Sequence, residues 1–263
     1  GSEMCIRDRS RNVHEHKINI SELRVIMNYI GIDLGTSAVK LLLMEGSGKI
    51  LKIVSREYPI CFPKPGWSEQ NPYDWFTQSM DGLKELLDGT DRSLVAGISF
   101  GGQMHGLVAL DDKDEVIRPA ILWNDGRTTK ECDYLNQVIG KERLSAYTAN
   151  ISFTGFTAPK VLWMKNNEPE NFAKIHKIML PKDYLAFRLS GNYSTDVSDA
   201  SGTLFFDCPK WSAYGNRRIF PRYIFRFIQI CSKCDSITIY KCHFLMVYFF
   251  TLWKSFIPFR YQL

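Results

Sequence analysis

Apolar residues between positions 28 and 110 fall into short blocks that are separated by polar turns. Runs of this length, bounded by glycine, serine or charged residues, are typical of strands. The first run ends at Asp33, and the turn Glu45-Gly46-Ser47-Gly48 separates the second run from the third. We therefore predict three strands joined by tight turns and then two later strands, at residues 29–32, 39–44, 49–58, 94–100 and 107–110.

A helical pattern of apolar residues follows Asn71, between the third and fourth predicted strands. Asn71 is a good N-cap, and Pro72 suits the first position of a helix. Apolar residues then recur at helical spacing; they are Trp75, Phe76, Met80, Leu83, Leu86 and Leu87. Further helices are predicted at about 127–138, 158–166 and 182–189, the last ending at Gly191. Together these elements predict an α/β domain over residues 28–210.

The composition is that of an ordinary globular protein, with 45% hydrophobic and 23% charged residues among 263. It excludes collagen-like, coiled-coil and wholly disordered classes. No apolar run approaches the ~18 residues that a membrane-spanning helix needs. Residues 1–27 begin with Gly-Ser and lack periodicity, so we interpret them as an artefactual or disordered leader and expect the natural start at Met27.

Residues 211–263 differ from the rest of the chain. They hold fifteen aromatic residues and eight Lys/Arg against one acid, so the net charge of +5 belongs to this tail, and the first 210 residues are slightly acidic. Neither helical nor strand spacing is present, which favours an out-of-frame tail. The alternatives are a basic module for nucleic acid or a membrane surface, and a zinc site at Cys231, Cys234, Cys242 and His243.

The residues that follow the first strand have clear chemistry. Asp33 brings a carboxylate to the strand end, and Gly35 permits a tight turn that exposes backbone N–H groups. The hydroxyls of Thr36 and Ser37 add donors, and Lys40 adds positive charge. Such a turn can hold phosphate oxygens while the carboxylate holds Mg²⁺ through water. The alternative is an ordinary hairpin turn, and the Walker glycine loop is absent.

Two further runs have side chains suited to a sugar. In residues 101–106 (GGQMHG), glycines allow close backbone approach, and Gln103 and His105 supply hydrogen-bonding groups for hydroxyls. In residues 123–127 (WNDGR), an aromatic face adjoins polar side chains. The structural alternatives are a glycine-rich strand end with a satisfied histidine, and a helix N-terminus capped by Asn124 or Asp125.

Three other polar runs have weaker signals. Residues 155–160 and 180–184 are typical of junctions between a loop and a helix. Residues 194–203 are acidic and rich in hydroxyl groups; they either close over a substrate or form a solvated loop.

Taken in order, these motifs resemble the N-terminal domain of the FGGY carbohydrate kinases, over about residues 27–207. The matching runs are 29–37 (YIGIDLGTS), 67–70 (WSEQ), 102–106 (GQMHG), 118–127 (RPAILWNDGR), 155–160 (GFTAPK), 180–185 (LPKDYL) and 198–203 (SDASGT). The resemblance implies a ribonuclease-H-like domain of the actin/hexokinase type on one side of a cleft. It also implies ATP and Mg²⁺ as cofactors and a small-molecule sugar as substrate.

The family's residue roles carry over to matching positions. The resemblance implies that Asp33 is the carboxylate of the catalytic centre and holds Mg²⁺ through water. It implies a phosphate site in the turn; its residues are Gly35, Thr36, Ser37 and Lys40. The implied sugar-binding residues are Gln103, Met104, His105, Trp123, Asn124, Asp125 and Arg127. The Met-His pair favours D-xylulose as the acceptor, since glycerol kinases carry an Arg-Glu pair there.

One feature of the family is missing. Its general base is an aspartate in a Gly-Gly-Asp-Asn run that opens a second domain, and no such run follows Gly202. The implied activity is ATP-dependent phosphorylation of D-xylulose to D-xylulose 5-phosphate, but without the second domain we expect no useful turnover from this chain alone. The alternatives are a kinase for another ketose or polyol, and a non-enzymatic sugar-binding or regulatory module of the same half-fold.

Partners and location follow from charge and cysteine usage. We expect no nucleic-acid or membrane partner, because the domain itself is slightly acidic. A chain of this size forms a core without disulfides, and its seven cysteines are scattered, which favours the cytoplasm. The oligomeric state stays open, with a homodimer of the full-length protein as one option.

Overall fold

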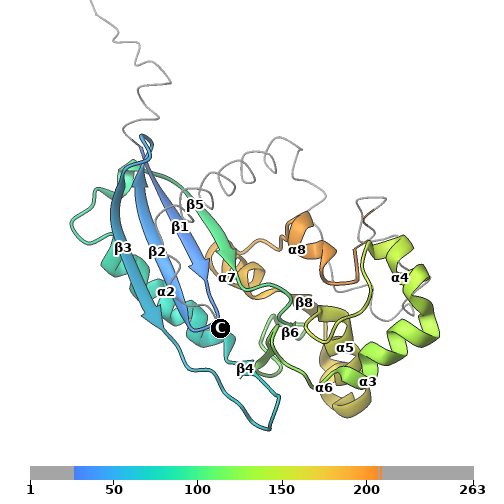
Figure 1. Ribbon diagram of the computed structural model, residues 1–263. Coiled ribbons are helices and arrows are strands. Elements are labelled where there is room, and N and C mark those ends of the chain that lie inside the picture. The colour runs from blue at the N-terminus through green and yellow to red at the C-terminus, as the bar shows by residue number, and fades with distance from the viewer. Residues whose placement is uncertain (1–26, 207, 209–263) are drawn as a thin grey trace, which may run out of the picture.

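A four-stranded sheet forms the first part of the computed structural model, which describes residues 27–206 and 208. Its strands are β1 (Asn28–Leu34), β2 (Ala38–Glu45), β3 (Ile50–Glu57) and β5 (Val95–Gly102), in the order β3-β2-β1-β5 (Figure 1). β2 pairs antiparallel with both β1 and β3, whereas β5 runs parallel to β1. The parallel pair brings two strand ends to one edge, where Asp33 lies beside Gly101.

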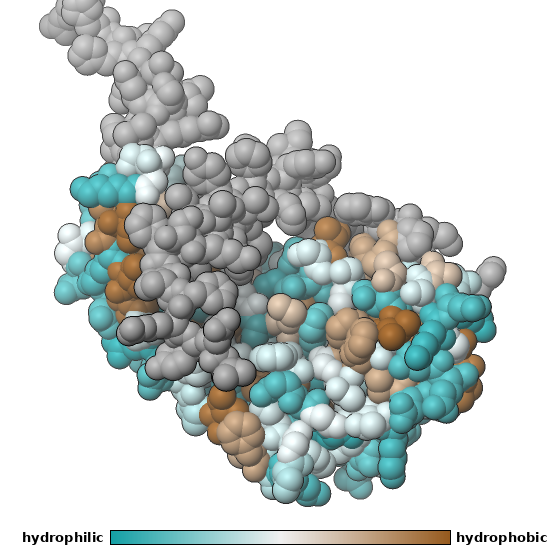
Figure 2. Space-filling view, in the orientation of Figure 1, coloured by the Kyte–Doolittle hydropathy of each residue, from teal (hydrophilic) through white to brown (hydrophobic). Residues whose placement is uncertain are grey.

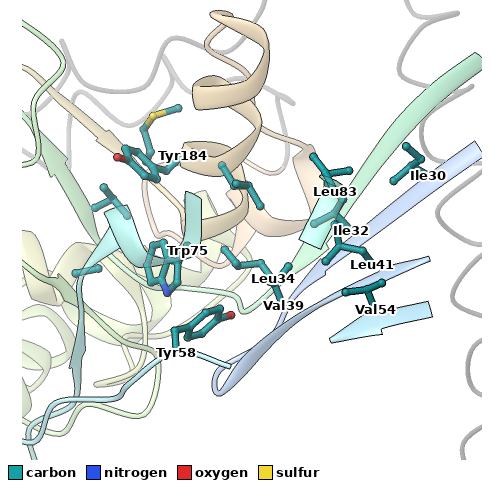
Figure 3. Packing of buried hydrophobic residues seen from close by; sticks show 14 of the residues in the cluster. Ile30, Ile32, Leu34, Val39, Leu41, Val54, Tyr58, Trp75, Leu83 and Tyr184 are labelled. Carbon is teal, nitrogen blue, oxygen red and sulfur yellow. The ribbon is translucent and has the colours of Figure 1, made fainter. Parts of the chain in front are cut away.

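Helix α2 (Pro72–Leu86) covers one face of this sheet (Figure 1). It begins as predicted, because the Asn71 side chain accepts a hydrogen bond from the backbone of Tyr73. Trp75 and Leu83 project from it into the core (Figure 3). A Cβ atom on Gly82 would lie 2.5 Å from Cδ1 of Leu41, so the close approach of helix and sheet requires glycine.

The second part of the domain consists of helices and two short sheets on the side away from β3 (Figure 1). β4 (Glu69–Gln70) pairs with β7 (Ala120–Ile121), and β6 (Val108–Leu110) pairs with β8 (Lys177–Met179). The helices are α3 (Thr129–Tyr134), α4 (Lys141–Thr148), α5 (Thr157–Asn167), α6 (Pro169–Lys174), α7 (Pro181–Ser190) and α8 (Val197–Ser201), and a 3₁₀ turn (Arg92–Leu94) precedes β5. Leu144 of α4 and Val161 and Met164 of α5 belong to a second core, whereas Tyr184 and Leu185 of α7 pack into the core of the large sheet.

The α/β fold class and the strands through residue 110 are confirmed. The helix predicted at about 127–138 is confirmed, since α3 continues without a break as a π-helical stretch (Leu135–Gly140). The sequence did not predict α4, which begins after Gly140, whose φ is 93°. Gly191 ends α7 as predicted, with a φ of 73°. The run 194–203 is not wholly loop, because it contains α8.

The predictions for the leader, for the tail and for its zinc site lie outside the described residues. Within residues 27–206 and 208, no helix combines the length and apolar character needed to cross a membrane. That same part of the chain has no cluster of three or more His, Cys, Asp or Glu side chains able to hold a metal ion.

Candidate active site

The turn between β1 and β2 is tightly closed by its own backbone. The backbone N–H of Gly35 donates to the carbonyl oxygens of Asp33 and Ala38, at 3.1 and 3.0 Å. A Cβ atom on Gly35 would lie 2.9 Å from the Ala38 oxygen, so the turn is closed too tightly for a side chain there. The Tyr58 hydroxyl donates to the Gly35 carbonyl and holds the turn from below, beside Trp75 (Figure 3).

Asp33 lies at the end of β1, opposite Lys40 of β2. Burial raises the pKa of its carboxyl group, and the charge of Lys40 opposes this rise. A half-buried carboxylate at the end of a strand fits Mg²⁺, which proteins commonly hold through one or two carboxylates, water and substrate phosphates.

The run 101–106 follows β5 and lies against the turn. The backbone N–H of Gln103 donates to the Leu34 carbonyl at 2.7 Å. The Met104 side chain is half exposed, and His105 adopts the left-handed region with a φ of 61°. Gly106 packs against α7, since a Cβ atom there would lie 2.6 Å from Cγ of Pro181. The loop is thus held at both ends, and the histidine bears its backbone strain.

The imidazole of His105 is partly buried and held in place by its neighbours. Its ring centroid lies 4.6 Å from that of Phe156. Burial and the charge of Lys160 lower the pKa of His105, while Asp199 opposes them. The neutral imidazole is therefore favoured at neutral pH. Nδ1 is buried without a hydrogen-bond partner among the described residues, which leaves Nε2 as the nitrogen that can meet a ligand.

Lys160 on α5 holds the backbone of this loop from inside the protein. Its Nζ donates to the carbonyl oxygens of His105 and Phe156, at 3.2 and 3.1 Å, and to that of Gly155. Thr157 Oγ1 also donates to the His105 carbonyl, at 3.2 Å. Burial lowers the pKa of Lys160 to about 7. The amine thus ties the strained histidine to the start of α5.

Replacing Lys160 with methionine should lower the free energy of unfolding by about 1–3 kcal/mol, since three carbonyls lose a donor. The difference should grow as the pH rises above 7. The folded wild-type protein releases the Lys160 proton near pH 7, whereas the unfolded chain holds it to about pH 10.4, so the wild type gains stability in that range.

Urea unfolding at several pH values measures this effect. Lys165→Met is the matched control, because Lys165 is exposed on the same helix. Parallel pH profiles for the wild type and Lys160→Met would contradict the prediction.

Trp123 joins the turn to the second sugar-binding run. Its indole Nε1 donates to Thr36 Oγ1 at 3.0 Å, and its side chain is 45% exposed. Gly155 lies directly behind it, since a Cβ atom there would be 2.7 Å from the Trp123 carbonyl oxygen. Phe153 is also half exposed and contacts Phe156, with ring centroids 5.3 Å apart. An exposed aromatic surface therefore lies beside the phosphate turn.

The structure brings together most of the residues expected from sequence, but it turns two of them inward. Asn124 is exposed next to Trp123. In contrast, the side chains of Asp125 and Arg127 are almost fully buried and form an ion pair at 2.7 Å. Asp125 also accepts a hydrogen bond from the backbone of Ser68 at 2.6 Å. These two residues hold the loop from within, so they do not offer their charges to a sugar.

The partners of Arg127 are residues that sequence reasoning missed. Its guanidinium group pairs with Glu69 at 2.7 Å and lies 3.7 Å from the ring centroid of Trp67. Arg118 pairs with Glu69 as well. The run WSEQ at 67–70 matched the family but carried no assigned chemistry, and the near-complete burial of its polar residues could not be read from the sequence.

The sheet order and this site define the actin/hexokinase-like class of α/β domains. Residues 28–213 match the model of the N-terminal domain of the FGGY family of carbohydrate kinases. The chain therefore belongs to the FGGY family of carbohydrate kinases.

Similar proteins of known sequence and structure agree. A xylulose kinase of Bacillus subtilis is 47% identical over 187 residues, which are 70% of this chain and 37% of that protein. One from Lactococcus lactis is 46% identical over 213 residues, covering 75% of this chain and 42% of that protein. The crystal structure of a xylulose kinase from Brucella ovis has a TM-score of 0.71 at 38% identity, covering 77% of this chain and 43% of that chain. The chain spans about two fifths of the length of the curated relatives it matches.

Proposed function

We propose that this chain is the sugar-binding half of a kinase that transfers a phosphoryl group from ATP to D-xylulose and forms D-xylulose 5-phosphate. The contact between Thr36 and Trp123 supports this most strongly, because it joins the phosphate turn to an exposed aromatic surface at 3.0 Å. Phosphoryl transfer depends on such positioning. The name of the similar proteins, xylulose kinase, supplies the acceptor.

The exposed side chains have complementary roles in this proposal. Met104 and Trp123 cover the C–H face of the sugar, and Asn124 bonds its hydroxyl groups. His105 meets a hydroxyl through Nε2, with its neutral form favoured by burial. Gln103 acts from beneath the loop, since its side chain is nearly buried. Asp125 and Arg127 position Trp123 and Asn124 through the buried ion pair rather than touching the sugar.

The same proposal assigns the phosphate side of the site. Backbone N–H groups of the turn and the hydroxyls of Thr36 and Ser37 bind phosphate oxygens, with Lys40 beside them. Asp33 would hold the water molecules of Mg²⁺, which neutralises phosphate charge when bound. A cytoplasmic location is also proposed, supported by the thiols of Cys61 and Cys132, which form no disulfide.

Calorimetric titration of the chain tests the proposal. D-xylulose should bind about tenfold more tightly than glycerol or D-gluconate, and Trp123→Ala should abolish that preference. Equal binding of glycerol would favour a polyol kinase, and an absence of sugar binding would overturn the proposal for this chain.

A further inference from the structure

Gln70 on β4 is a buried amide with all of its main hydrogen bonds filled. Its Nε2 donates to the carbonyl oxygens of Thr36 and Pro59, at 2.7 and 3.3 Å. Its Oε1 accepts from Trp75 Nε1 at 3.1 Å and from Gln103 Nε2 at 3.0 Å. The residue is 2% exposed, so none of these bonds competes with bulk water. One side chain thus contacts both the phosphate turn and the sugar loop.

The chemistry of the neighbours fixes the orientation of this amide. An indole nitrogen is only a donor, so the atom of Gln70 that faces Trp75 must be the oxygen. Backbone carbonyls are only acceptors, so the atom that faces Thr36 and Pro59 must be the nitrogen. The alternative orientation of the Gln70 amide, in which oxygen and nitrogen exchange places, is therefore excluded.

The fixed orientation of Gln70 in turn sets that of Gln103. Because Gln70 presents its oxygen to Gln103, the amide nitrogen of Gln103 must be the donor. The Oε1 atom of Gln103 is then directed away, as a buried acceptor without a partner among the described residues. A flip of Gln103 would set two oxygens against each other inside the protein.

We propose that Gln70 is a positioning residue. It fixes the turn that contains Thr36 (the phosphate turn) relative to residues 101–106 (the sugar loop). It acts through Thr36 on one side and through Gln103 on the other. The bonds span 34 and 33 residues of sequence and enter from β4, so no local turn chemistry can replace them. The identity of the ligands of the turn and the loop rests on the proposed function. The positioning role of Gln70 rests on its hydrogen bonds within the chain.

Two variants of nearly the same size distinguish the donor role of the Gln70 amide nitrogen from the acceptor role of its oxygen. In Gln70→Glu the ionised group loses the donors to Thr36 and Pro59 but still accepts from Trp75 and Gln103. In Gln70→Met both sides are lost. Amide hydrogen exchange of the 263-residue chain measures the outcome: Gly35 and Tyr58 report on the turn, and Gln103 and Gly106 report on the loop.

We expect Gln70→Glu to accelerate exchange about tenfold at the turn and to leave the loop unchanged, whereas Gln70→Met accelerates both. Gln137→Glu is the control, because it makes the same change at an exposed position. Equal acceleration of turn, loop and α2 in both Gln70 variants, or no acceleration in either, would overturn the proposal.

A change of pH provides a second readout that simple destabilisation does not produce. When the introduced acid is protonated, it regains a donor and can bond the Thr36 carbonyl again. Burial should bring this protonation well above the usual carboxyl range. After correction for intrinsic exchange, turn protection in Gln70→Glu should therefore return towards the wild-type level as the pH falls to about 5, and it should not return in Gln70→Met. Identical pH dependence in both variants would overturn the role of the donor.

Titration with D-xylulose distinguishes this inference from the proposed function. If the wild type binds the sugar, Gln70→Met should bind it about tenfold more weakly, and Gln70→Glu should resemble the wild type because its loop is intact. If the wild type binds no sugar but the exchange pattern holds, the positioning role stands and the proposed function fails. If sugar binds but the exchange pattern is absent, the proposed function stands and the positioning role of Gln70 fails.

Discussion

Replacing Gly202 with alanine should weaken sugar binding about tenfold while leaving the fold nearly intact. Gly202 follows α8 and lies against the imidazole of His105. A Cβ atom there would be 2.2 Å from Cε1 and 2.7 Å from Nδ1 of the ring, distances that no packed structure tolerates. The ring has to leave its place, because the backbone of His105 is held by Lys160 and Thr157.

The displacement acts on function more than on stability. The imidazole is a terminal group and only partly buried, so it can swing outward at a cost of about 1 kcal/mol. In the proposed function its Nε2 would then lose its hydrogen bond to a sugar hydroxyl, which accounts for the expected loss in binding.

Calorimetry with D-xylulose and urea unfolding measure the two effects separately. Gly97→Ala on β5 is the control, since a Cβ atom there meets nothing within 4 Å. A Gly202→Ala protein that binds sugar as the wild type does would show that His105 is not a sugar contact.

The tight turn after Asp33 and the first three strands could be predicted because their determinants are local. Asp33, Gly35 and the apolar runs on either side are neighbours in sequence, and a tight turn between antiparallel strands needs no other information. The cap at Asn71 was predictable for the same reason. Local chemistry therefore accounts for the turn that we propose to bind phosphate.

The internal support of the sugar loop could not be predicted, because its bonds connect distant segments. Lys160 meets His105 across 55 residues, and Gln70 meets Gln103 across 33. Residue type alone misled as well. Asp125 and Arg127 have groups that sugars bind, yet their charges are used by Glu69 and by each other inside the protein. Exposure, rather than chemistry, separates Trp123 and Asn124 from these two neighbours.

A buried ionic cluster holds α8 and thereby Gly202. The Nζ atom of Lys182 on α7 lies 2.6 Å from Asp183, 2.7 Å from Asp196 and 3.0 Å from Asp199. Asp196 has a second role, since its side chain caps α8 through the backbone N–H groups of Ser198 and Asp199. One buried cation thus compensates three carboxylates and fixes the helix that backs the imidazole of His105.

The charges in this cluster depend on one another. Burial disfavours the charge of Lys182, but the three carboxylates outweigh burial and raise its pKa. Burial also acts to raise the pKa of Asp196, but the charge of Lys182 outweighs it and holds this pKa at about 2. The contribution of Asp196 to stability is therefore complete above its unfolded pKa of about 3.9 and is lost as the pH falls towards 2.

Replacing Lys182 with methionine should lower the free energy of unfolding by about 3 kcal/mol at pH 7, because it leaves the buried carboxylate of Asp183 and the partly exposed carboxylates of Asp196 and Asp199 without their cation. Without the charge of Lys182 their pKa values should rise, so the deficit of the variant relative to the wild type should shrink as the pH falls to about 5. Lys177→Met is the control: its pair with Asp114 is partly exposed, and its loss should cost about 1 kcal/mol. Urea unfolding at pH 7 and at about pH 5 measures the loss of stability in each variant and its change with pH. A deficit that stays constant with pH would mean that lost packing, rather than uncompensated charge, destabilises the variant.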